Sequence, residues 1–126
     1  MIIGLGVDAV DISRIRRWME KPGLLARFFH PQELADTHSR GNSAAYSLAA
    51  RFAAKEAYGK ALGTGLRGMT LKNILVTNNP SGRPSLTLYG DALLPFTQLK
   101  GSAIHLSLTH ESSIAIACVI LEGCEK

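Results

Sequence analysis

The sequence predicts an α+β fold in one domain spanning residues 1–126. Helical patterns cluster in the first half of the chain and strand patterns in the second half. The longest helical pattern runs from about Asn42 to Leu62, is rich in alanine, contains no proline and ends at Gly63 in the position of a C-terminal glycine cap. Late in the chain, two pairs of β-rich segments each flank a turn, which predicts antiparallel hairpins.

The N-terminal segment predicts a strand followed by a helix. "MIIGLGVDAV" is apolar and β-branched, which is typical of a strand, here one that ends near Asp8. Ser13 would cap a helix over "RIRRWMEK" that stops at Pro22 and Gly23, and Asp11 also suits a helix start.

This helix would carry a basic stripe, formed by Arg14, Arg17 and Lys21 at positions i, i+3 and i+7. The apolar residues that would face the core instead are Ile15, Trp18 and Met19. The basic stripe is explained either by a solvated helix face or by a docking surface for an acidic partner.

The remaining elements follow from turn and capping signals. Pro31 takes the first position of a short helix in "HPQEL". "LKNILVTNN" and "PSLTLYG" flank the turn "NPSGRP", and "SAIHLSLTH" and "IAIACVILE" flank "ESS". Between these hairpins, "GDALLPFTQLKG" predicts a helix that has to accommodate Pro95.

Composition limits the classes of function. A net charge of +4 favours an acidic partner or a polyanionic ligand, but aromatic residues make up only 6% and do not alternate with basic ones, which argues against nucleic acid. Without a signal-peptide pattern or an apolar run near about 20 residues, we expect a cytoplasmic protein with no membrane partner.

The two cysteines, Cys118 and Cys124, lack C-x-x-C spacing, which indicates a buried thiol in a reducing compartment. A zinc site is not expected either, because no His/Cys pair has zinc-ligand spacing.

Residues 63–68, "GTGLRG", match the dinucleotide-binding pattern G-x-G-x-x-G letter for letter. That motif needs a strand before its first glycine and a helix after its last, whereas here a long helix precedes and a strand candidate follows. A P-loop is excluded because no G-K-[ST] ends the run. Two explanations remain: a connection that uses glycine for positive φ, or a backbone cradle for a phosphate helped by Arg67 and Lys60.

Charged residues interrupt the long helix. Glu56 and Lys60 lie at i and i+4, which is consistent with a surface ion pair. The alternative is a functional pair, in which the Glu56 carboxylate binds a hard cation and Lys60 neutralises a phosphoryl oxygen. Arg51 and Lys55 share that spacing, and their like charges weaken the helix unless an anion lies between them. Asp8 is the candidate for a second Mg²⁺ carboxylate, because an acid at the end of an apolar strand is costly to bury without a partner. Spacing alone does not bring Asp8 to Glu56.

Three blocks resemble the holo-[acyl-carrier-protein] synthases, the small bacterial type of 4′-phosphopantetheinyl transferase: "GLGVDAVDISRI", "RFAAKEAYGKALGTG" and "HLSLTHESSIAIACVIL". The resemblance implies a compact α+β subunit with a mostly antiparallel sheet packed on the long central helix, assembled as a homotrimer with each site at a subunit interface. It also implies transfer of the 4′-phosphopantetheine group of coenzyme A to a serine of apo acyl carrier protein. This reaction releases adenosine 3′,5′-bisphosphate and supports fatty acid biosynthesis.

The resemblance assigns roles by position. Asp8 and Glu56 match metal ligands, which implies Mg²⁺ as the cofactor, and Lys60 matches the lysine that approaches the pyrophosphate, so these three are the expected catalytic residues. The expected coenzyme A contacts are Arg51, Lys60, Gly63, Gly65, Thr109 and His110. The expected carrier-docking residues are those of the basic stripe, Arg14, Arg17 and Lys21. Glu56 or a water on the metal would take the serine proton.

Some features depart from the family pattern or leave alternatives open. Val7 replaces a polar residue, Asp11 replaces a glutamate, and His30 stands where a threonine often caps the second helix. His110 would otherwise make a structural hydrogen bond. Two competing classes of function are a non-catalytic trimer that binds coenzyme A or an acidic carrier, and a small nucleic-acid binder.

Overall fold

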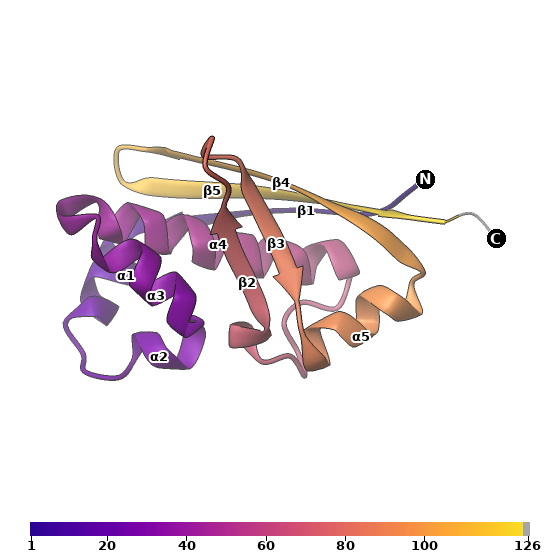
Figure 1. The fold of residues 1–126 in the computed structure, drawn as a ribbon, viewed down its shortest axis with the longest axis horizontal. Coiled ribbons are helices and arrows are strands. Elements are labelled where there is room, and N and C mark those ends of the chain that lie inside the picture. The colour runs from indigo at the N-terminus through magenta and orange to yellow at the C-terminus, as the bar shows by residue number, and fades with distance from the viewer. Residues whose placement is uncertain (125–126) are drawn as a thin grey trace.

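A three-stranded antiparallel sheet lies across one side of the long helix α4 in the computed structural model, which describes residues 1–124 (Figure 1). Short helices and a two-stranded hairpin lie on the other sides of α4. The helices are α1 (Ile12–Met19), α2 (Leu25–Phe28), α3 (Pro31–His38), α4 (Ala44–Leu62) and α5 (Gly90–Gln98). The strands are β1 (Ile2–Asp11), β2 (Ile74–Asn78), β3 (Pro84–Leu88), β4 (Gly101–Glu111) and β5 (Ile114–Gly123). The α+β class and the antiparallel sheet on a central helix are confirmed.

The first strand is longer than the sequence predicts. The sheet has the order β1-β5-β4, and β1 remains paired with β5 as far as Asp11 opposite Ile114. Asp8, which we expected near the strand end, therefore lies inside the strand, opposite Ala117. The predicted hairpins β2–β3 and β4–β5 and the helix α5, with Pro95 inside it, are all present.

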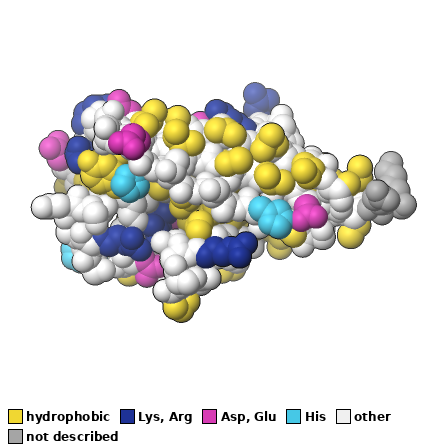
Figure 2. Space-filling model, turned by 90° about the horizontal axis from the view of Figure 1, so that it is seen from above, with side chains coloured by type: hydrophobic (Ala, Val, Ile, Leu, Met, Phe, Trp, Pro, Cys, Tyr) yellow, Lys and Arg dark blue, Asp and Glu magenta, His cyan; other side chains and the backbone are white. Residues whose placement is uncertain are grey.

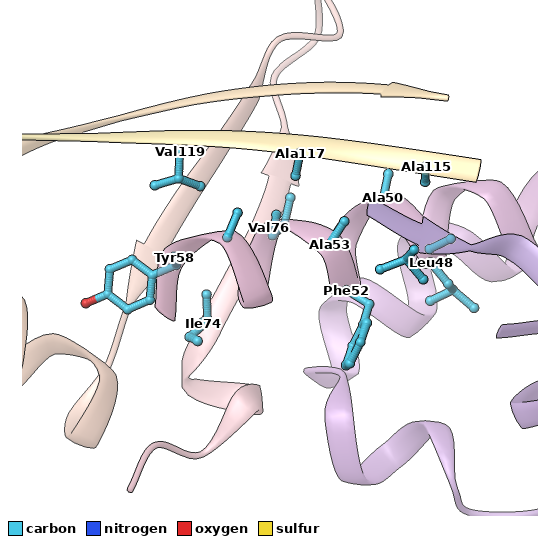
Figure 3. Close-up of a cluster of buried hydrophobic side chains, with 14 of the residues drawn as sticks. Leu48, Ala50, Phe52, Ala53, Tyr58, Ile74, Val76, Ala115, Ala117 and Val119 are labelled. Atoms are coloured by element: carbon cyan, nitrogen blue, oxygen red, sulfur yellow. The ribbon is translucent and has the colours of Figure 1, made fainter. Parts of the chain in front are cut away.

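Helix α4 forms the centre of the buried core. It begins at Ala44, ends at Leu62, and is capped by Gly63 with φ 85°, as the glycine pattern predicts. Most of its residues are buried, which is typical of a helix that is apolar on all sides. Figure 3 shows Ala115, Ala117 and Val119 of β5 lying over α4, with Ile74 and Val76 of β2 on another side of the same helix.

Two glycines in β1 allow this strand to lie directly against α4. A Cβ atom on Gly6 would lie 2.0 Å from the carbonyl oxygen of Ala57, and one on Gly4 would lie 2.1 Å from that of Ala61. Any larger residue would force the strand away from the helix. The glycines therefore set the distance at which Asp8, on the same strand, meets α4.

The caps of the N-terminal helices confirm the expected helix start at Asp11 but not the expected cap at Ser13. Asp11 caps α1 by accepting a hydrogen bond from the Ser13 backbone N–H, so the expected cap at Ser13 is wrong, because β1 continues to Asp11 and the helix begins directly after it. Helix α3 does begin with Pro31, and His30 caps it, with Nδ1 accepting from the Gln32 N–H. His30 thus performs the capping that we associated with threonine.

On the face of the three-stranded sheet turned away from α4, the central residues of β1 and β5 are apolar, whereas the β4 residues paired with β5 there, His105, Ser107 and Thr109, are polar. Leu5 and Val7 of β1 are 60% and 51% exposed, and alternate β5 residues are half-buried. We call this surface the outer sheet face; its residues are Leu5, Val7, Ile116, Cys118 and Ile120. Figure 2 looks onto the molecule from this side and shows hydrophobic side chains gathered along it.

Two further expectations concern the burial of the cysteines and the presence of a membrane-spanning segment. Cys118 is half-buried and Cys124 is exposed, so the expected buried thiol is wrong: Cys118 lies on the outer sheet face and Cys124 follows the end of β5. Neither cysteine is in a disulfide within residues 1–124. Among these residues, no helix combines the length and apolar character needed to cross a membrane.

Candidate active site

Asp8 and Lys60 meet where β1 crosses α4. Asp8 is on the same side of β1 as the buried Gly6 and Val10, so its side chain faces the helix. Lys60 Nζ donates to Asp8 Oδ1 at 2.9 Å, and it lies 3.3 Å from the Val7 carbonyl oxygen. The hydrogen bond to Asp8 raises the pKa of Lys60 and keeps its ammonium group charged. The lysine is therefore held by Asp8 rather than by Glu56, its neighbour on the helix.

Glu56 belongs to the same cluster. Partial burial raises the pKa of its carboxyl group, and the negative charge of Asp8 raises that pKa further, whereas the charges of Arg14 and Lys60 lower it. Asp8 contacts Lys60, which lies one helical turn from Glu56, so the structure brings both carboxylates to the same part of α4, which sequence spacing did not establish. We call Asp8, Glu56 and Lys60 the carboxylate cluster.

The carboxylate cluster suits a hard divalent cation. Mg²⁺ prefers oxygen ligands and is commonly bound through one or two carboxylates together with water and substrate phosphates. No group of three or more His, Cys, Asp or Glu side chains that could hold a metal occurs within residues 1–124. A Mg²⁺ ion at Asp8 and Glu56 would take its remaining ligands from oxygens other than these two side chains, such as water and substrate phosphates.

A second candidate site is a cavity of about 430 Å³ at the N-terminal half of α4. Its wall includes Arg51, Thr109 and His110, three of the residues that the family resemblance assigns to coenzyme A. The wall also includes Tyr46 of α4, Arg40 before that helix, and Asn78, Gly82 and Pro84 at the β2–β3 turn. We call it the Arg51 cavity.

Arg51 gives the Arg51 cavity its chemical character. The side chain is only 2% exposed, and Nη1 donates to Ser47 Oγ. Within the described residues, Nε and Nη2 are buried and have no hydrogen-bond partner. Burial lowers the pKa of this guanidinium, which means that its charge is poorly compensated by the chain itself. Unpartnered guanidinium nitrogens at a cavity wall are suited to a phosphate group.

Lys55, one turn further along α4, has a different environment. Its Nζ donates to Glu33 Oε1 at 2.7 Å and to the Leu71 and Ile74 carbonyl oxygens, and both side chains of the ion pair are fully buried. The anion that neutralises Lys55 is thus a side chain of α3. Sequence analysis missed Glu33, although a glutamate three residues after His30 is a capping-box signal that pointed to its hydrogen bond with the His30 N–H.

The expected coenzyme A residues do not all converge within one chain. Arg51 and Glu56 are five positions apart on α4, which places their side chains about 140° apart around the helix. Gly63 and Gly65 lie beyond the C-terminal end of α4 and are not part of the Arg51 cavity. The Gly65 N–H donates to the Gly59 carbonyl, so this segment folds back onto the last turns of the helix. A single copy of the chain therefore presents two separate parts of the expected site, the Arg51 cavity and the carboxylate cluster with the glycines after α4.

The basic stripe is only partly continuous. Helix α1 ends at Met19, so Lys21 lies outside the helix, and Met19 is exposed rather than in the core because the helix is too short to bury it. Arg17 donates to Ser13 Oγ at 3.4 Å. The Arg14 guanidinium carbon lies 5.0 Å from the Trp18 ring centroid and 5.3 Å from that of Phe52. Arg14 and Arg17 remain exposed and can meet a partner.

Comparisons with known proteins identify the family of the chain and agree with its fold. Residues 4–119 match the family model of the 4′-phosphopantetheinyl transferase superfamily. A holo-[acyl-carrier-protein] synthase from Treponema denticola is 54% identical over 123 residues, covering 98% of this chain and 100% of the relative. The crystal structure of the Neisseria meningitidis holo-[acyl-carrier-protein] synthase has a TM-score of 0.83 at 36% identity and covers 97% of this chain and 99% of that one.

The chain is also similar in structure to a relative that was solved with a bound ligand. The holo-(acyl-carrier-protein) synthase from Bacillus anthracis, in complex with CoA (3′,5′-ADP), has a TM-score of 0.82 at 31% identity and covers 98% of this chain and 99% of that one. The family match and the 54% relative both extend over nearly the whole chain. The chain therefore belongs to the holo-[acyl-carrier-protein] synthases of the 4′-phosphopantetheinyl transferase superfamily.

Proposed function

We propose that the chain transfers the 4′-phosphopantetheine group of coenzyme A to a serine hydroxyl of apo acyl carrier protein. The serine oxygen forms a bond to the phosphorus that carries the pantetheine arm. The phosphoanhydride bond to adenosine 3′,5′-bisphosphate breaks, and its electron pair leaves with the bisphosphate. The observation that carries this proposal is the carboxylate cluster, where Lys60 of α4 donates to Asp8 of β1 at an accessible position one helical turn from Glu56.

The residues of the carboxylate cluster divide the chemistry between them. Asp8 and Glu56 would hold Mg²⁺, which when bound supplies positive charge to the pyrophosphate oxygens. Lys60, which is 54% exposed, is positioned to neutralise a phosphoryl oxygen as charge shifts onto the leaving phosphate. Either Glu56 or a water held by the metal would take the serine proton as the general base.

The Arg51 cavity would bind the nucleotide end of coenzyme A. Its unpartnered guanidinium nitrogens would donate to a phosphate of the adenosine 3′,5′-bisphosphate part, and Thr109 and His110 line the same wall. Gly63 and Gly65 would lie along the pantetheine or pyrophosphate part, next to Lys60 at the end of α4.

A homotrimer would join the two parts of the site. The outer sheet face is an exposed apolar surface of the kind that marks protein contacts. We infer that other copies of the chain cover it, and that the carboxylate cluster of one copy meets the Arg51 cavity of the next. Each active site would then lie at a subunit interface, which also encloses a ligand too large for one small subunit.

The exposed arginines of the basic stripe would dock the carrier. Acyl carrier proteins are small and acidic, so Arg14 and Arg17 suit electrostatic steering of an acidic helix. Lys21 would contribute from the turn after α1. We place the reaction in the cytoplasm and in fatty acid biosynthesis, where carrier proteins require the phosphopantetheine arm.

Mass spectrometry tests this function directly. The protein is mixed with apo acyl carrier protein, coenzyme A and Mg²⁺, and the carrier should gain the mass of one phosphopantetheine group. Glu56→Gln should lower turnover by at least about 100-fold while circular dichroism shows an intact fold. Glu20→Gln, which removes a charge from the exposed end of α1, serves as the matched control and should retain activity.

Three results would contradict the proposal. A carrier that gains no mass under conditions in which a known transferase is active would leave a non-catalytic binding protein. Near-normal turnover of Glu56→Gln with Mg²⁺ limiting would contradict the metal assignment. A protein that runs as a monomer at working concentration and is fully active would contradict the shared sites.

A further inference from the structure

Arg16 of α1 lies outside the basic stripe and contacts a different part of the molecule. Its guanidinium carbon is 5.3 Å from the ring centroid of Tyr46 on α4. The Tyr46 ring in turn packs against the His110 imidazole, with the ring centroids 5.0 Å apart and the ring planes 43° apart. Arg16, Tyr46 and His110 therefore form a stack that joins three elements, α1, α4 and β4.

The stack ends at the wall of the Arg51 cavity. Tyr46 and His110 both line that cavity, whereas Arg16 lies behind Tyr46 and is exposed. A second contact supports this arrangement, because the Ile12 N–H at the start of α1 donates to the Ser113 carbonyl in the turn after β4 at 2.8 Å. The position of α1 is thus tied to the same end of the β4–β5 hairpin that carries Thr109 and His110.

We propose that Arg16 is a positioning residue for nucleotide binding, holding Tyr46 against His110 so that the wall of the Arg51 cavity is preformed for the adenosine 3′,5′-bisphosphate part of coenzyme A. Helix α1 then serves both substrates, with Arg14 and Arg17 turned to the carrier and Arg16 turned to the nucleotide. This inference rests on the proposed function, because it takes coenzyme A as the occupant of the cavity.

Replacing Arg16 should weaken nucleotide binding by a small factor without affecting the carrier. A cation–π contact at an exposed position changes an equilibrium by roughly two- to fivefold. Arg16→Gln should therefore raise the Kd for adenosine 3′,5′-bisphosphate and the KM for coenzyme A by about that factor, with kcat and the KM for carrier unchanged. Arg16→Lys, which keeps a cation over the ring, should restore most of the affinity.

Two variants make the test selective. Arg17→Gln is the matched control: it removes the same charge from the same helix, and it should raise the KM for carrier while leaving the Kd for the bisphosphate unchanged. Tyr46→Ala should weaken the bisphosphate at least as much as Arg16→Gln. The double variant Arg16→Gln/Tyr46→Ala should then bind no more weakly than Tyr46→Ala alone, because Arg16 acts through Tyr46.

Titration calorimetry with adenosine 3′,5′-bisphosphate, in the absence of carrier, separates this inference from the function on which it rests. If the wild-type protein binds the bisphosphate and Arg16→Gln binds it equally well, the role of Arg16 is overturned while the proposed function stands. Additive losses in the double variant, or equal losses in Arg16→Gln and Arg17→Gln, would also overturn it, since a general charge effect would then be the cause. A wild-type protein that does not bind the bisphosphate would overturn both.

Discussion

Arg51 and Lys55 lie one turn apart on the same side of α4, and both are almost completely buried, yet their surroundings differ. Lys55 donates to the Glu33 carboxylate and to two backbone carbonyls, so its ammonium group has all the acceptors it can use. Arg51 has one hydrogen bond to Ser47 and, within residues 1–124, two buried nitrogens without a partner.

The difference separates a cation that the fold itself neutralises from one that is incompletely paired, and under the proposed function the second cation binds a phosphate. A buried charge with a complete set of internal partners connects parts of the fold, here α3, α4 and the start of β2. A buried charge with unused donors carries a desolvation cost that a ligand can offset. The two residues look alike in the sequence, so their environments are the evidence for assigning them different roles.

Removing the structural cation should have the largest effect on stability. Lys55→Met leaves the Glu33 carboxylate buried without its counter-charge, and we expect the free energy of unfolding to fall by about 3–5 kcal/mol. Urea denaturation followed by circular dichroism measures this loss. The double variant Glu33→Gln/Lys55→Met should recover more than half of it, because glutamine keeps an acceptor for the Val76 N–H without a charge. A loss below about 1 kcal/mol for Lys55→Met would remove the contrast with Arg51.

Removing Arg51, the cation proposed to bind the ligand, should leave stability intact and weaken ligand binding. Arg51→Met eliminates an incompletely paired buried charge, so the free energy of unfolding should stay unchanged or rise. Affinity for adenosine 3′,5′-bisphosphate should fall by roughly 10- to 150-fold, the range for a lost hydrogen bond to a charged group. At one fixed concentration, the bisphosphate should raise the Tm of the wild-type protein more than that of Arg51→Met in thermal scans. A destabilised variant that still binds normally would show that Arg51 is structural as well.

Asp91 extends the comparison to an exposed charge with a full set of partners. Its carboxylate accepts from Asn73 Nδ2 at 2.9 Å, and from the Thr70 N–H and hydroxyl. These hydrogen bonds lower the pKa of Asp91 below its ordinary value of 3.8. The lowered pKa means that the carboxylate stabilises the fold at pH values above 3.8 and loses this contribution as the pH falls through its folded-state pKa.

The change Asp91→Asn should therefore give the smallest effect and one that depends on pH. The difference in free energy of unfolding between wild type and variant should be constant near neutral pH and should shrink as acid protonates the wild-type carboxyl group. Urea denaturation at a series of pH values measures it, and bisphosphate binding should be unchanged. A difference that persists undiminished in acid would mean that the charge on Asp91 is not its cause.

Local signals predicted most of the elements. The alanine-rich pattern and the glycine cap correctly predicted α4 and its C-terminal end, and the turn residues correctly predicted both hairpins. Helix caps and tight turns can be predicted in this way because they depend on residues that are neighbours in the sequence. The cap at Ser13 was wrong, and so was the end of β1 at Asp8, because pairing with β5 extends the strand to Asp11. A cross-strand partner that lies more than 100 residues away in the chain leaves no local signal.

The sequence alone determined the helices, the hairpins and the candidate residues for the chemistry: an acid in an apolar strand, a glutamate and a lysine one turn apart, and an arginine in an alanine-rich helix. Only the tertiary structure decided which of these meet. It brings Asp8 to Lys60 through glycines that admit β1 against α4, pairs Lys55 with Glu33, and leaves two buried nitrogens of Arg51 without a partner among residues 1–124. The physical reason is that a charge is stabilised by what surrounds it in space, and for a buried charge those groups come from distant parts of the chain.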